Sequence, residues 1–94
     1  MDIQSDRFKH IRFERSKKMG KKYDAIIEDK ITKRQIRIPF GDVNYEHYRD
    51  TTGLKLYSRL DHNDTKRRAA YKARHELTRH KKYSASWYSD NYLW

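Results

Sequence analysis

The 94-residue chain contains no cysteine, a single proline, three isolated glycines and no long apolar run. Without cysteine, neither a disulfide framework nor a thiolate metal site supports a small core. No G-x-x-x-x-G-K sequence is present, which excludes a phosphate-cradling loop of that type. The chain also lacks the run of about 18 apolar residues that a membrane-spanning helix needs and the apolar segment of a signal peptide. We therefore expect no transmembrane segment, and a soluble protein that is intracellular or packaged in a particle.

Aliphatic side chains are scarce as well. Ile, Leu, Val and Phe account for 16 of the 94 residues, a share that is typical of disordered chains when the net charge is as high as +10. Eight Tyr and two Trp offset this shortage, because each aromatic ring buries a large area. We expect a tyrosine-rich core whose hydroxyl groups reach the surface. A chain of this length buries only about 60–65% of its unfolded surface, which argues against a large enclosed active site.

Positive charge is concentrated at the two ends of the chain. Residues 1–22 contain eight Lys or Arg against three acids, residues 23–63 seven against seven, and residues 64–94 eight against three. Such clustering is typical of contact with a polyanion, because cations gain affinity by releasing counterions from a phosphate backbone. The alternative is a solvated surface that keeps a small protein soluble.

The hydrophobic pattern predicts a small α+β domain. Apolar residues alternate at 23–27 and again at 36–40, with a polar turn between them, which is the pattern of a β-hairpin. Pro39 has no N–H for the strand ladder, so the second strand lies at a sheet edge or residue 39 faces outward. We interpret residues 1–22 as a basic N-terminal arm and residues 23–94 as the domain.

One main helix is expected to pack on the hairpin, from about Asp64 to Lys81, with Asn63 or Asp61 as its N-cap. Helical spacing predicts an apolar stripe that packs inward and a cationic face on the opposite side. The apolar stripe comprises Ala70, Ala73 and Leu77. The cationic face comprises Arg68, Lys72, His75 and Arg79.

An aromatic segment closes the chain, with five large rings in the last twelve residues. These rings are Tyr83, Trp87, Tyr88, Tyr92 and Trp94. In one interpretation the segment folds back over the hairpin and completes the core. In the other it docks a partner or offers stacking surfaces to nucleic-acid bases.

Two groups of basic residues are the candidates for binding nucleic acid or another polyanion. The helix contributes Arg67, Arg68, Lys72, Arg74 and Arg79, and the arm contributes Lys17, Lys18, Lys21 and Lys22. Side chains of these types contact phosphates. Since no Asn or Gln accompanies the cations of the helix, we expect binding with little sequence preference.

Two short motifs raise enzymatic alternatives. The segment "HELTRH" resembles the zinc-protease motif His-Glu-x-x-His, but His75 and His80 are five residues apart and lie on different faces of a continuous helix. Glu28 and Lys30, with Asp24 before them, have the E-x-K form of some metal-dependent nucleases, a pattern that also arises often by chance. We therefore predict no catalytic residues, no metal site and no cofactor.

The order of elements resembles a family of small, basic, uncharacterised proteins encoded by large nucleocytoplasmic DNA viruses. Members have a strand ending in Phe-Gly, a Tyr-rich turn, a helix of the form H-x-D-x-x-R-x-x-Y-x-x-R-H and a final Leu-Trp. The resemblance covers residues 22–94, with residues 50–60 as an insertion. The matching positions are Phe40 and Gly41, Tyr45 and Tyr48, His62, Asp64, Arg67 or Arg68, Tyr71, Arg74 and His75, then Leu93 and Trp94. It implies a viral, virion-associated role without enzymatic activity, and transfers no catalytic residues.

The sequence thus favours a non-enzymatic virion protein that binds nucleic-acid phosphates, with double-stranded DNA as the favoured partner. It would act in the virion and in the host nucleus or cytoplasm during infection. The main alternative is a minor capsid or cement protein whose basic surface meets acidic shell proteins. A metal-dependent nuclease is the least favoured class.

Overall fold

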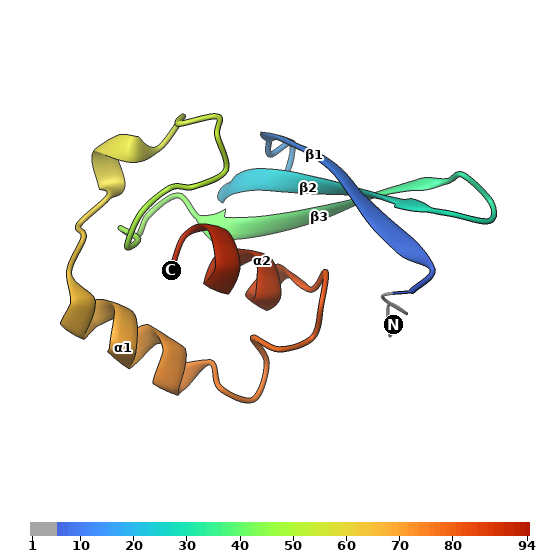
Figure 1. Cartoon of the computed structure of the whole chain (residues 1–94). Helices are drawn as coiled ribbons and strands as arrows, with labels where there is room; N and C mark the ends of the chain where they lie inside the picture. Colours follow the sequence, from blue (N-terminus) through green and yellow to red (C-terminus); the bar gives the residue numbers. More distant parts are fainter. Residues whose placement is uncertain (1–5) are drawn as a thin grey trace.

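Three antiparallel strands form a sheet in the computed structural model, which describes residues 6–94. They are β1 (Phe8–Arg15), β2 (Lys21–Asp29) and β3 (Gln35–Asp42), in the order β1-β2-β3 (Figure 1). The predicted hairpin is confirmed as β2 and β3, with Tyr23 opposite Phe40. Pro39 lies on an edge strand, as its missing N–H predicts. Two helices follow, α1 (Thr65–Arg74) and α2 (Ala85–Tyr92), and the α+β class is confirmed.

The basic stretch expected as an arm contributes a strand to this sheet. Residues 1–5 lie outside the described part of the chain, but β1 pairs with β2 along its length, so the arm interpretation is wrong from residue 8 onward. The pairing register shifts between His10 and Arg12. This bulge inserts Ile11, which shifts the apolar period by one residue between Phe8 and Phe13. The strand therefore shows no regular alternation in the sequence.

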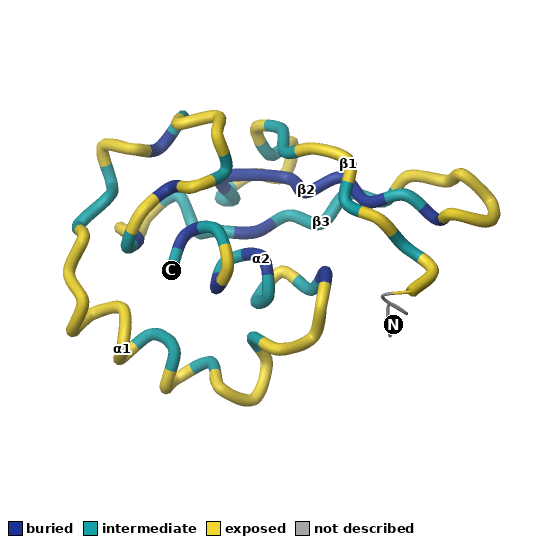
Figure 2. The backbone as a smooth tube through the Cα atoms, viewed as in Figure 1, coloured by how far each residue is buried: buried dark blue, intermediate teal, exposed yellow. Residues whose placement is uncertain are grey.

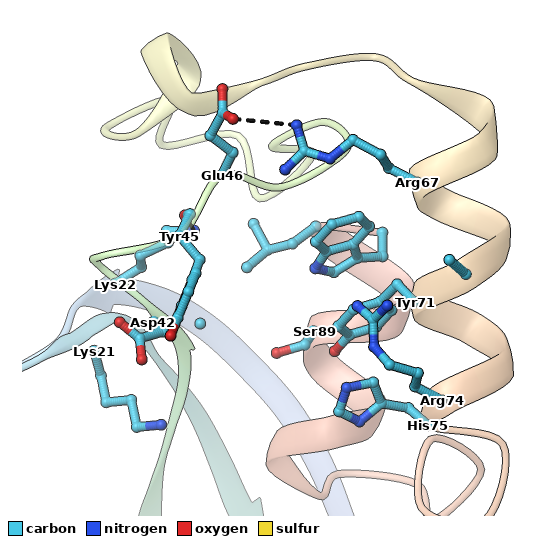
Figure 3. Close-up of a pocket in the computed structure, with 14 residues that line it drawn as sticks. Lys21, Lys22, Asp42, Tyr45, Glu46, Arg67, Tyr71, Arg74, His75 and Ser89 are labelled. Atoms are coloured by element: carbon cyan, nitrogen blue, oxygen red, sulfur yellow. Dashed lines mark hydrogen bonds and ion pairs between the residues drawn. The ribbon is translucent and has the colours of Figure 1, made fainter.

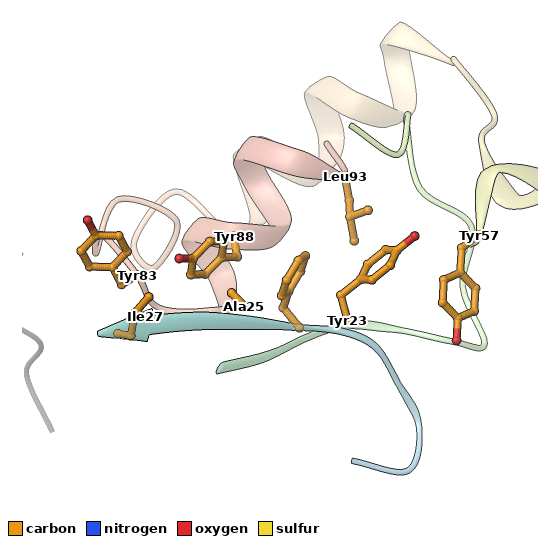
Figure 4. Close-up of a cluster of buried hydrophobic side chains, with 8 residues drawn as sticks. Tyr23, Ala25, Ile27, Tyr57, Tyr83, Tyr88 and Leu93 are labelled. Carbon is orange, nitrogen blue, oxygen red and sulfur yellow. The ribbon is translucent and has the colours of Figure 1, made fainter. Parts of the chain in front are cut away.

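The core lies between α2 and one face of the sheet (Figure 4). From β2 it takes Tyr23, Ala25 and Ile27, all fully buried. Over these strands lies the Tyr88 ring, with its centroid 5.4 Å from that of Phe40. The sheet alone offers few aliphatic side chains, so aromatic rings from the end of the chain complete the core.

The aromatic C-terminal segment is therefore part of the core, which confirms the first of its two interpretations. Tyr83 and Tyr88 are buried, and Trp87, Tyr92 and Trp94 pack against the core cluster. Eight of the last ten residues, Ala85–Tyr92, form a helix that the sequence did not predict. The helix begins where the Ser84 hydroxyl accepts a hydrogen bond from the Trp87 backbone N–H.

The main helix is shorter than predicted and packs through its other face. Asp64 caps α1 in place of Asn63 or Asp61, and the helix ends at Arg74, so the predicted extension to residue 81 is wrong. The predicted packing stripe is also wrong. Its members Ala70, Ala73 and Leu77 are all exposed, Leu77 to 94%.

The inward face of α1 comprises Tyr71 and Lys72 and continues through His75 and Arg79, all of which are half-buried. A tyrosine ring and the stems of long cations cover more area than two alanine methyl groups, which explains the reversal. No residue of α1 is fully buried, and Figure 2 shows the helix largely exposed along the outside of the molecule. Among residues 6–94, neither helix is long and apolar enough to cross a membrane.

Candidate polyanion-binding groove

A groove of about 530 Å³ separates α1 from the adjoining ends of β2 and β3 (Figure 3). Its floor is formed by Lys22, Gly41 and Leu93. Gly41 has a φ of +77°, and a Cβ atom at this position would lie only 2.8 Å from the Leu93 Cδ1 atom. The missing side chain therefore allows the last turn of the chain to close on the strand end beneath the groove.

The groove brings together the two basic stretches of the sequence. Lys21 lines it from the start of β2, and Arg67 and Arg74 line it from α1. Figure 3 shows Lys21 and Arg74 on opposite sides of the opening. Within the described part of the chain, neither of these two side chains forms an ion pair. The predicted Lys17 and Lys18 are exposed on the turn that precedes Lys21.

Three other predicted cations hold α1 in place. Lys72 Nζ lies 2.7 Å from an Asp90 carboxylate oxygen, and Arg79 lies 3.5 Å from the second oxygen of that carboxylate. Arg68 donates to the backbone oxygen of Trp94 over 2.7 Å. Because these groups already have partners on or next to α2, the cationic face of α1 is mostly turned inward.

An aromatic stack forms the helix side of the groove. The Tyr71 ring lies between two other rings, with centroids 4.3 Å from those of both Trp94 and His75. The planes of Tyr71 and Trp94 are almost parallel, at 2°. Burial raises the pKa of the Tyr71 hydroxyl above its ordinary value. This stack attaches α1 to the end of the chain, and the helical spacing of the sequence did not predict it.

A buried polar relay lies behind the floor. The Lys22 ammonium is 2.7 Å from the Tyr45 carbonyl oxygen and 2.9 Å from His47 Nδ1. His47 Nε2 in turn lies 2.5 Å from an Asp61 carboxylate oxygen. A carboxylate only accepts hydrogen bonds, so Nε2 carries the proton and Nδ1 accepts from the ammonium. Burial and then the Lys22 charge lower the pKa of His47, which keeps the ring neutral at pH 7.

The relay and a neighbouring group of bonds order residues 43–61, which contain only one 3-10 turn, η1 (Ser58–Leu60). The Tyr23 hydroxyl donates to the Asp50 carboxylate and accepts from the Leu56 backbone N–H. The Asp50 backbone N–H donates to Asp61 over 2.9 Å. Buried polar groups that all have partners fix this irregular segment against β2.

The buried amine of Lys22 should give the free energy of unfolding an unusual dependence on pH. Burial lowers the pKa of its amine to about 8, from 10.5. Between these two values the unfolded chain binds more protons than the folded chain, so the free energy of unfolding should rise with pH. Tyr23 acts in the opposite sense above pH 10, because burial and the Asp50 carboxylate raise the pKa of its hydroxyl to about 12. Stability should therefore peak near pH 10.

Urea unfolding between about pH 7 and pH 11 measures both effects. Lys22→Met should remove the rise above pH 8 and keep the decline above pH 10, since only the amine is lost. A rise of equal size in both proteins would show that Lys22 is not the titrating group.

The residues of the two enzymatic motifs lie apart from the groove floor. The "HELTRH" segment forms turns after α1, with the His75 ring stacked on Tyr71 and His80 Nε2 3.0 Å from Glu76. Asp24 is buried and accepts from Ser16 and Arg37. Within residues 6–94 no three His, Asp or Glu side chains form a group suited to a metal ion.

Compared with protein-family models, with curated proteins and with solved structures, the chain matches none. The groove is therefore the main guide to its function.

Proposed function

We propose that this chain is a small, non-enzymatic protein that binds the phosphates of nucleic acid with little sequence preference. The observation that carries the proposal is that Lys21, Arg67 and Arg74 line one groove. These cations come from stretches of sequence that lie more than forty residues apart. Bringing like charges together costs free energy, and an anionic ligand removes that cost.

The charges of the groove support an anionic ligand. Its cations are Lys21, Lys22, Arg67 and Arg74, against two carboxylates, Asp42 and Glu46. One of these acids is already paired, because Glu46 lies 3.1 Å from Arg67. The exposed Lys17 and Lys18 extend the positive surface beyond the groove along the turn before β2. A surface of this kind contacts backbone phosphates without reading bases.

Binding without catalysis is supported by the surroundings of the Lys22–His47–Asp61 relay. Such a chain of groups is able to move a proton, and Lys22 belongs to the groove floor. Lys22 is only 2% exposed, however, and the two contacts of its ammonium are with Tyr45 and His47 within the fold. These bonds hold the irregular segment in place, so we assign the relay a structural role. Association with a virion rests on the resemblance of residues 22–94 to proteins of large DNA viruses.

Salt dependence tests the proposal. Fluorescence anisotropy with labelled oligonucleotides should show binding that weakens by orders of magnitude between low and moderate salt. Lys21→Gln combined with Arg74→Gln should weaken binding at low salt about tenfold or more, and lower the salt slope by about 1 to 2. Different base sequences should bind with similar affinity.

A matched control removes two charges from the far end of the sheet. Lys30→Gln with Arg34→Gln changes the exposed β2–β3 turn, which projects away from α1 in Figure 1. This variant should retain most of the affinity. Equal losses in both variants would mean that net charge acts without the groove. No binding at low salt would contradict the proposal and favour a minor capsid role.

A further inference from the structure

One aromatic ring of the groove is exposed. Tyr45 is 68% exposed on the side of the groove opposite Tyr71, as Figure 3 shows. Its backbone is nonetheless fixed, because its carbonyl oxygen accepts from the buried Lys22 ammonium and its N–H donates to the Asp42 carbonyl oxygen over 3.2 Å. The Tyr45 ring is therefore exposed to solvent, while two hydrogen bonds hold its backbone in place. Such a ring is suited to stacking with a planar ligand.

From these positions we infer that the groove accepts an unpaired nucleotide of a single-stranded nucleic acid, with its base on the Tyr45 ring and its phosphate between Lys21 and Arg74. This inference rests on the proposed function and adds the form of the nucleic acid. Aromatic side chains beside cations are the usual means of holding single strands, because every base offers a π-face.

Duplex DNA fits the same surface less well. Bases in a duplex are stacked on each other, so none is free for Tyr45 without unpairing. The outward face of α1 is also unsuited to a row of phosphates, because Ala69 and Ala73 are exposed there and the exposed Leu77 follows just beyond the helix end. The groove, at about 530 Å³, is of a size to accept one nucleotide but not a DNA duplex. These observations favour a single strand over the duplex.

Three probes of equal length separate base contacts from phosphate contacts. They are an oligothymidylate, an abasic oligonucleotide with the same phosphates, and a duplex. The oligothymidylate should bind about tenfold more tightly than the abasic strand, which is the range that stacking of one base provides. It should also bind more tightly than the duplex.

Tyr45→Ala should reduce the affinity for oligothymidylate about tenfold, to that of the abasic strand, while Tyr45→Phe should retain it. Because this side chain is exposed, both variants should fold like the wild type, which circular dichroism checks. Equal binding of oligothymidylate and abasic strand, or preference for the duplex, would overturn the inference and leave phosphate binding intact. Binding of none of the probes at low salt would overturn the proposed function as well.

Discussion

Replacing Tyr88 with alanine should lower the free energy of unfolding by about 3–5 kcal/mol, the usual loss for a large aromatic ring in a core. The side chain is fully buried between α2 and the sheet. Its ring centroid lies 5.7 Å from that of Phe13, 5.4 Å from that of Phe40 and 4.9 Å from that of Trp87. A domain of this size has few other apolar contacts with which to compensate. Urea unfolding followed by far-UV circular dichroism measures the loss.

Two matched variants separate packing from hydrogen bonding at this position. Tyr88→Phe keeps the ring but removes the hydroxyl group, which lies 2.8 Å from His10 Nδ1, and should cost only about 1 kcal/mol. Tyr45→Ala removes the same side chain from an exposed position and should change stability by less than about 0.5 kcal/mol. If Tyr88→Ala cost no more than Tyr45→Ala, α2 would not cover the sheet as described.

Replacing Gly41 with alanine should be the second severe substitution, with a loss of about 2–4 kcal/mol from two causes. The positive φ of +77° strains any residue with a Cβ atom. The new methyl group would also lie 2.8 Å from Leu93 Cδ1 and 3.2 Å from Lys22 Cδ. Leu93 is 1% exposed and has little room to move. The loss is measured by urea unfolding between about pH 6 and 7, below the pKa of about 8 that the Lys22 amine has in the folded chain.

Gly20 provides the control for this substitution. Its φ of +87° is similar, but a Cβ atom there would have no neighbour within 4 Å. Gly20→Ala should therefore show the backbone strain alone, about 1 kcal/mol. The difference between the two variants measures the contact with Leu93 and Lys22. Equal losses would mean that the chain end does not close on the strand at Gly41.

The sequence was informative where a regular period continued over several residues. The alternation at 23–27 and 36–40 predicted the hairpin. The density of aromatics after residue 82 allowed two interpretations, of which the structure confirms the place in the core. It was uninformative for β1, where the bulge at Ile11 shifts the period. The inward-packing face of α1 was predicted incorrectly, because the spacing of apolar residues gives no information on the stacking of Tyr71 on Trp94.

The candidate site was predictable in its charges only. Lys21, Lys22, Arg67 and Arg74 were all candidates for polyanion contact, and they line one groove. Lys72 and Arg79 were candidates too, but their contact with Asp90 depends on α2, which the sequence did not predict. Tyr45 and His47 were missed as groove and relay residues. Their roles depend on tertiary contacts with Lys22, which is more than twenty residues away in the sequence. Contacts at this separation leave no periodic pattern in the sequence.

The groove has one side that belongs to the core and one that does not. Its floor of Lys22, Gly41 and Leu93 is packed against the sheet, so changes there alter the stability of the whole domain. Its other side is α1, which has no fully buried residue and is attached by ion pairs and stacked rings. Substitutions in α1 should therefore alter the ligand specificity of the groove with little loss of stability. Evolution or protein engineering would change the bound ligand through α1 rather than through the floor.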